Sequence, residues 1–124
     1  MNPTPAHQRK LAVLSFLSLD GVMQAPSSPD EDTSGGFTHG GWARDYWAEV
    51  MEQVQREAMN VPYDMLFGRK TYELFAPHWS SQGSDDPLAT MMNNAKKHVV
   101  SNQNLDLTWQ NSVQISNDVC SKVK

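Results

Sequence analysis

The middle of the sequence alternates between strand patterns and helix patterns, and this alternation limits the possible folds more than any other feature. Short apolar runs predict strands at Tyr63–Phe67 and Lys96–Ser101. Between them, the sequence predicts a helix over Thr71–Trp79, which ends near Pro77, and another over Leu88–Ala95. This order is typical of an α/β fold with a mostly parallel sheet and flanking helices. In such sheets, ligands bind beyond the carboxyl ends of the strands.

The regions on either side carry further expected elements. Arg9–Leu19 is apolar on both faces, which predicts a buried central strand. Trp42–Asn60 has apolar residues at spacings of three and four, which predicts an amphipathic helix. Near the end of the chain we expect strands at Asp106–Trp109 and Val113–Ile115, an N-cap within Ser116–Asp118, and a helix over Val119–Lys122.

Length and composition indicate the class of protein. With 124 residues, the chain suits one domain, which we expect to cover residues 9–124 after a flexible lead-in at residues 1–8. Apolar residues make up 39% of the chain and charged residues 19%, which is typical of a globular protein and not of a disordered one. Ala25–Gly41 combines Pro, Ser, Gly and acidic residues, so we expect a long surface loop there.

Charge, hydropathy and cysteine content argue against several classes of function. The net charge of −4 disfavours nucleic acid as a partner. Leu11–Leu19 is shorter than the roughly 20 residues that cross a bilayer, and no signal-peptidase site follows it. We therefore expect a cytoplasmic protein without a membrane partner. Cys120 is the only cysteine and the four histidines are widely spaced, so neither a disulfide nor a metal site is expected.

Gly68-Arg69-Lys70-Thr71 follows one predicted strand and opens the next predicted helix. Free backbone N–H groups, the helix dipole and two cations would then meet at one place, which suits a phosphate. A glycine turn followed by a solvated basic helix start explains the same residues, and the sequence leaves both interpretations open. The motif is not a Walker A loop, because that loop needs a glycine five residues before a Gly-Lys pair.

Two further polar groups follow predicted strands. Ser101 and Asn102 follow the second strand as Gly68 and Arg69 follow the first, so they could line the same edge beside one nucleotide. Taken alone, this dipeptide is more typical of a turn. Asp20 lies at the end of the predicted strand 9–19 and could act as a positioned acid or as a hydrogen-bond anchor for a substrate. A local Asp-Gly turn is the alternative that the residues alone favour.

Four motifs follow one another along the chain: SLDG (18–21), LFGRKTYE (66–73), KHVVSN (97–102) and LTWQNS (107–112). In these motifs and in their order, the sequence resembles the dihydrofolate-reductase-like superfamily. Within it, the sequence is most similar to the C-terminal reductase domain of bifunctional riboflavin-pathway deaminase-reductases and to their stand-alone relatives. The resemblance covers the chain from about Arg9 onward. It implies a three-layer fold with a mostly parallel central sheet, NADPH as cofactor, hydride transfer to a small-molecule substrate, and a homodimer.

The resemblance also implies roles for individual residues. Those expected to bind the cofactor phosphates and the adenosine 2′-phosphate region are Gly68, Arg69, Lys70, Thr71, Ser101 and Asn102. Asp20 would be the catalytic residue near the nicotinamide. Residues expected to border the substrate pocket, with the 25–41 loop, are Ser18, Trp42 and Tyr46.

The sequence departs from the family pattern at two places. In riboflavin synthesis the family reaction is that of a 5-amino-6-(5-phosphoribosylamino)uracil reductase, and such members usually have Lys directly after the Asp-Gly pair. Val22 stands there in this chain, which favours another small heterocyclic or sugar-derived substrate. Family members also continue beyond the position of Lys124 with a glycine-rich cofactor turn and further strands, so the resemblance implies that residues 9–124 are an incomplete, N-terminal portion of the domain.

Two other functions remain open from the sequence. The chain could be a non-catalytic, oligomerising relative or a truncated fragment that keeps the fold without full cofactor binding, since a fold does not guarantee an activity. It could also be an acidic interaction module that docks through the helix predicted at 42–60, although amphipathic helices usually bury their apolar stripe in their own core.

Overall fold

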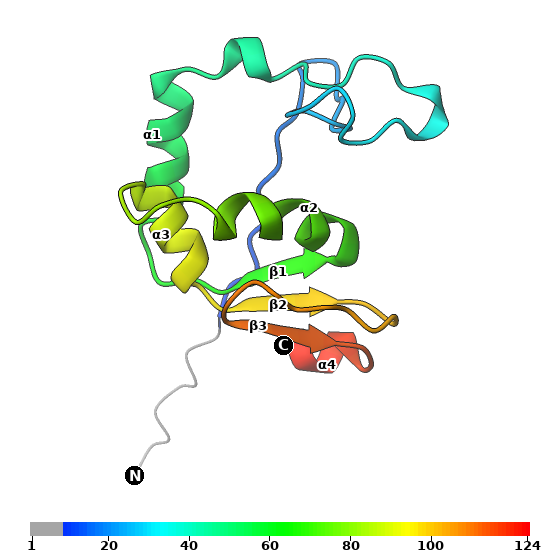
Figure 1. Ribbon diagram of the computed structural model, residues 1–124, viewed down its shortest axis with the longest axis vertical. Coiled ribbons are helices and arrows are strands. Elements are labelled where there is room, and N and C mark those ends of the chain that lie inside the picture. Colours follow the sequence, from blue (N-terminus) through cyan, green and yellow to red (C-terminus); the bar gives the residue numbers. More distant parts are fainter. Residues whose placement is uncertain (1–8) are drawn as a thin grey trace. The chain divides into compact units, whose positions relative to one another are not determined.

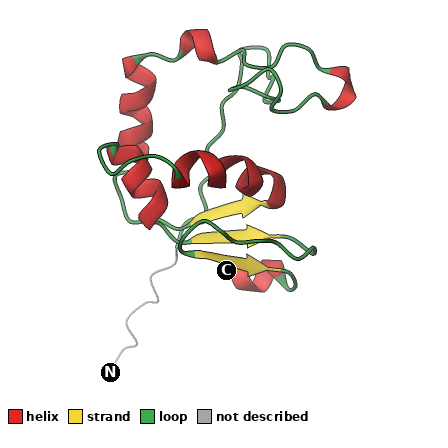
Figure 2. Ribbon diagram, viewed as in Figure 1, coloured by secondary structure: helices red, strands yellow, loops and turns green. Residues whose placement is uncertain are grey.

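The computed structural model describes residues 9–124 (Figures 1 and 2). The flexible lead-in expected at residues 1–8 lies outside the described residues. The described chain divides into two compact units, one that ends at Gln53 and one that covers Val54–Lys124, and each unit has its own internal contacts.

The second unit contains a three-stranded sheet. Its strands are β1 (Met65–Gly68), β2 (Lys97–Val100) and β3 (Ser112–Ile115), in the order β1–β2–β3. Both neighbouring pairs are parallel, which confirms the α/β class with a parallel sheet and flanking helices (Figure 2). Because Gly68 pairs with Val100 and Val100 with Ile115, the carboxyl ends of the three strands are level at one edge.

Two helices connect β1 to β2 and a third follows β3. The first, α2 (Arg69–Ser80), starts two residues before the predicted helix and continues past Pro77 to Ser80, although Pro77 has no N–H to donate to the carbonyl four residues earlier. The second, α3 (Pro87–Asn94), begins where the Asp86 carboxylate accepts hydrogen bonds from the first-turn backbone. The last, α4 (Val119–Val123), follows Asp118 as expected, although no side chain caps it.

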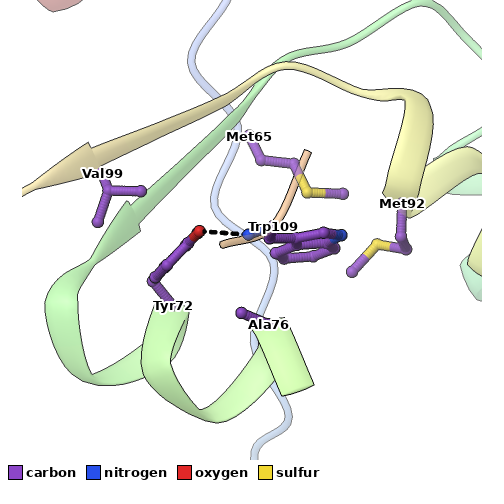
Figure 3. Packing of buried hydrophobic residues seen from close by; sticks show 6 residues of the cluster. All are labelled: Met65, Tyr72, Ala76, Met92, Val99 and Trp109. Atoms are coloured by element: carbon purple, nitrogen blue, oxygen red, sulfur yellow. Dashed lines mark hydrogen bonds between the residues drawn. The ribbon is translucent and has the colours of Figure 1, made fainter. Parts of the chain in front are cut away.

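The core of this unit lies between the sheet and the connecting helices (Figure 3). Its buried cluster consists of Met65, Tyr72, Ala76, Met92, Val99 and Trp109. Trp109 is 1% exposed, and its backbone N–H donates to the Tyr72 hydroxyl at 3.0 Å. The strand expected at Asp106–Trp109 is therefore wrong: this segment is irregular, because Trp109 turns inward to fill the core and does not extend a ladder.

The first unit contains no strand among its described residues. Arg9–Leu19 is irregular, and Val13 is 90% exposed, so the buried central strand expected there is wrong. An isolated apolar segment becomes a strand only when a neighbouring edge satisfies its backbone N–H and C=O groups, and no described segment of this unit provides that edge.

The rest of the first unit consists of short turns and one helix. The loop expected at 25–41 is confirmed as irregular apart from the 3₁₀ turn η1 (Ser34–Gly36). The helix predicted over 42–60 is confirmed in part, because a second 3₁₀ turn, η2 (Arg44–Tyr46), precedes α1 (Glu49–Ala58), which crosses into the second unit. None of the helices found in residues 9–124 combines the length and apolar character that crossing a membrane requires.

Candidate functional site

The sequence predicts a possible phosphate-binding site at the start of α2. β1 ends at Gly68 and α2 begins at Arg69, so the Gly68–Thr71 motif lies at a strand-to-helix junction. Gly68 is the N-cap residue and has no side chain to accept a hydrogen bond from the first turn, and that turn contains no acidic residue. The first backbone N–H groups of a helix carry a partial positive charge, so this junction favours an anion.

Gly68 leaves open space at this junction. A Cβ added to Gly68 would meet no atom of residues 9–124 within 4 Å. The backbone of Gly68 is extended, with φ of −77° and ψ of 165°, which any residue can adopt. The described fold therefore does not require glycine at this position, whereas a ligand that approaches the backbone closely would require it.

The two cations of the motif differ in their surroundings. The Arg69 guanidinium forms an ion pair with the Glu73 carboxylate one turn along α2, at 2.8 Å, and both side chains are partly exposed. Such exposed pairs contribute little to stability, so a phosphate could replace the carboxylate at small cost. Lys70 and Thr71 are exposed beside it.

Ser101 and Asn102 follow β2 at the same edge of the sheet. Gly68 pairs with Val100, so Ser101 comes one residue beyond the strand partner of Gly68. The Ser101 hydroxyl is held in a local turn, where it donates to the Gln103 carbonyl and accepts from the Gln103 backbone N–H, both at 3.1 Å. This geometry corresponds to the turn interpretation of the dipeptide. Asn102 is exposed at the tip of that turn.

Asp20 lies in a tight turn of the first unit. The Ser18 hydroxyl donates to the Asp20 carboxylate at 2.6 Å and accepts from the Val22 backbone N–H at 2.8 Å. Gly21 has a φ of +91°, which favours glycine at this turn. The hydrogen bond from Ser18, followed by one from the backbone of Asp20 itself, lowers the pKa of Asp20. A carboxylate that stays ionised is suited to anchor a hydrogen-bond donor and is poorly suited to donate a proton.

The aromatic residues expected at the substrate pocket lie in the same unit as Asp20. The Trp42 indole N–H donates to the Gln24 carbonyl at 2.9 Å, which ties it to the start of the 25–41 loop. Tyr46, on η2, is 79% exposed. Of the residues expected at the substrate, Ser18 and Asp20 are hydrogen-bonded to each other, and Trp42 is held by the Gln24 carbonyl. The residues expected to bind the cofactor belong to the second unit.

Neither of two surface hollows in the second unit includes an expected site residue. The larger, of about 400 Å³, lies between α3 and the segment before β1, and Tyr63 and Met91 are among its lining residues. The Tyr63 hydroxyl is buried without a hydrogen-bond partner, and burial raises the pKa of Tyr63. The smaller, of about 190 Å³, is lined by Asn93, Trp109 and Gln110 with two neighbouring residues. Among residues 9–124, no three His, Cys, Asp or Glu side chains gather closely enough to hold a metal ion.

Lys97, which the sequence indicates only as part of a strand, has an unusual environment in the structure. Lys97 is completely buried. Its ammonium donates to the backbone carbonyls of Asn93 at 2.7 Å and Gln110 at 3.1 Å, and it lies 4.3 Å from the centre of the Trp109 ring. Loss of hydration on burial lowers the pKa of Lys97 to about 8. The two-residue spacing from Lys97 to buried Val99 is the signal that could have placed it on the inward face.

Comparisons with known proteins do not identify a family for this chain. No protein-family model matches the chain, and no curated protein matches it. The resemblance to dihydrofolate-reductase-like reductases therefore rests on the four quoted motifs alone.

Proposed function

We propose that this protein is an NADPH-dependent reductase of the dihydrofolate-reductase-like superfamily, related to the riboflavin-pathway reductases. It transfers a hydride to a small heterocyclic or sugar-derived substrate in the cytoplasm. The observation that carries the proposal is the open strand-to-helix junction at Gly68–Thr71, with its uncapped helix start, its two cations and the space left by Gly68. NADPH, when bound, supplies the hydride, and the protein supplies position and charge.

The residues of the junction fit a dinucleotide phosphate. The first-turn N–H groups of α2 would donate to phosphate oxygens, and the space beside Gly68 would let them approach. Arg69 would exchange Glu73 for the phosphate, and Lys70 would add a second charge. The Ser101 hydroxyl is engaged in its own turn, so Ser101 would act by shaping the turn that presents Asn102 to the 2′-phosphate region.

In the first unit, the ionised Asp20 would accept a hydrogen bond from an N–H or O–H group of the substrate. Ser18 holds that carboxylate in place and keeps it ionised through their hydrogen bond. Trp42 and Tyr46 would offer flat apolar faces to a heterocycle. The Asp20 role is thus that of an anchor for the substrate, and no proton transfer is assigned to it.

The test is a titration of the purified chain with NADPH and with NADH, followed by the shift of its melting temperature, because a bound ligand stabilises the folded state. We expect saturable binding that prefers NADPH. Replacing Arg69 with alanine removes a charge-assisted hydrogen bond of about 1.5–3 kcal/mol, so NADPH affinity should fall about 10- to 100-fold. Glu73→Gln should tighten binding, because it removes the carboxylate that competes for Arg69.

Lys96→Ala is the matched control, since Lys96 is an exposed cation at the opposite end of the sheet from the junction. It should leave NADPH affinity unchanged within about twofold, which is smaller than the effect of one charge-assisted contact. Absence of saturable binding to the folded chain, or an Arg69→Ala variant with the affinity of the wild type, would refute the cofactor assignment.

A non-catalytic, oligomerising relative is the second candidate function, and one observation favours it. Leu66 and Val113 are 40% and 39% exposed, and the register aligns them with His98 in one row on the sheet face opposite buried Met65 and Val99. An all-parallel sheet is usually covered on both faces. A homodimer that covers this row would be indifferent to nucleotide, which light scattering with and without NADPH would show.

A further inference from the structure

The Lys97 ammonium lies in a buried position lined by neutral groups, which we call the seat of Lys97. Its ammonium has two carbonyl partners, one at the end of α3 and one in the connection between β2 and β3, and it faces the Trp109 ring. Trp109 is itself fixed, because its indole N–H donates to the Asn93 side-chain oxygen at 2.6 Å. A buried ammonium without a negative partner bears a desolvation cost that hydrogen bonds to carbonyls offset only in part.

No charged group of the described residues contacts this ammonium. The titratable residues on the segments packed around it are Lys96 and His98 on its own strand, Tyr63 and Asp64 before β1, Asp106 in the β2–β3 connection, and Arg69, Lys70, Tyr72, Glu73 and His78 on α2. α3 and β3 contain none. His98 pairs with Asp64, and Tyr72 accepts its hydrogen bond from the Trp109 backbone. The charge of Lys97 is therefore uncompensated.

The groups around Lys97 also hold the β2–β3 connection to α3. The Gln110 side chain donates to the Asn93 carbonyl at 2.9 Å, and the Asn111 side chain donates to the Asn94 carbonyl at 3.2 Å. The hollow of about 190 Å³ adjoins this seat and is lined by three residues that surround the ammonium. An opening of the connection at this hollow would bring water to the ammonium.

We propose that Lys97 is a proton-controlled latch on the β2–β3 connection: the neutral amine keeps the connection closed over Trp109, and the protonated form favours a local opening that brings the ammonium to water. Burial lowers the pKa of Lys97 to about 8 in the closed form, against 10.5 for a hydrated lysine. By linkage, the form that binds the proton more tightly gains population as the pH falls. The open form is the one favoured at lower pH.

The Trp109 indole N–H reports directly on this opening, because it is buried and donates to Asn93. Its hydrogen exchange is measured by NMR from pH 7 to 9.5, below the ordinary tyrosine pKa, and corrected for intrinsic exchange. With Lys97 pKa values of about 8 closed and 10.5 open, the opening equilibrium should fall about 25-fold over this range. The Lys97→Met variant should stay closed, with slow exchange that no longer depends on pH.

Lys96→Met is the control, since Lys96 is the exposed neighbour of Lys97, and it should keep the pH dependence of the wild type. A direct titration of the Lys97 side-chain carbon resonance should show a midpoint near 8, independently of any variant. An ordinary lysine midpoint, or Trp109 exchange with the same pH dependence in wild type and Lys97→Met, would overturn the proposal. The test involves no nucleotide, so its outcome is independent of the cofactor assignment.

Discussion

The side chain of Asn93 connects the two helices and the β2–β3 connection of the second unit, and its removal gives a sharp prediction. The Asn93 oxygen accepts from the Trp109 indole N–H at 2.6 Å, and the Asn93 amide donates to the Trp79 carbonyl at 3.1 Å. Alanine at this position deletes both bonds but keeps the backbone carbonyl that accepts from Lys97 and Gln110. The perturbation is therefore confined to two hydrogen bonds.

The size of the effect follows from burial. Trp109 is 1% exposed, so its indole N–H loses its partner in a place where an unsatisfied donor costs about 1–3 kcal/mol. The lost bond to Trp79 adds about 0.5–1.5 kcal/mol. The hollow lined by Asn93 and Trp109 lets a water molecule replace part of the loss. We therefore expect the free energy of unfolding to fall by about 2 kcal/mol, a large share of the 5–15 kcal/mol that holds most domains together.

Urea unfolding of two adjacent variants isolates this effect. Asn94→Ala is the matched control, because Asn94 is exposed in the same helical turn and its side chain forms no hydrogen bond within the described part of the chain. Both variants gain the same helix propensity of about 0.5 kcal/mol, which cancels in their difference. Asn93→Asp should recover about half of the loss, since it keeps the acceptor for Trp109. Equal stabilities of the two alanine variants would refute the reasoning.

Three further predictions concern other parts of the chain. The free energy of unfolding of the wild type should rise by about 2.6 kcal/mol from pH 8 to 10.5, because the unfolded Lys97 keeps a proton that the folded one has lost; chemical denaturation of Lys97→Met should show no such rise. Ser18→Ala should raise the pKa of Asp20 toward 3.8, seen as a shifted midpoint in a carboxyl-carbon NMR titration, and an unchanged midpoint would contradict the hydrogen-bond cause. Gly40→Ala should disorder the 25–41 loop, since its Cβ would lie 2.6 Å from the Pro29 carbonyl oxygen; unchanged amide spectra would exclude that clash.

The elements of the second unit were predictable because local patterns determine them. Short apolar runs bounded by glycine or polar residues give the strands at Met65–Gly68 and Lys97–Val100. The amphipathic pattern after Gly68 gives the helix that follows the first of them. Two features depend on distant contacts and were missed. Trp109 leaves the expected strand because Tyr72 and Asn93 hold it in the core. Arg9–Leu19 forms no strand because apolar composition supplies no partner for its backbone.

In the candidate site too, the sequence predicts where residues lie but not which hydrogen-bond or ion-pair partners they have. The sequence is enough to expect Gly68 and Ser101 at one sheet edge, because parallel strands end together, and the register bears out that placement. It is not enough to show which donors are already engaged. The four-residue spacing from Arg69 to Glu73 could have revealed their ion pair, since such residues meet on a helix surface. The turn at Ser101 is the interpretation that the dipeptide alone favours, and it engages the hydroxyl with the backbone of Gln103. If NADPH binds as proposed, its phosphate competes with Glu73 for Arg69, and Glu73→Gln measures that competition directly.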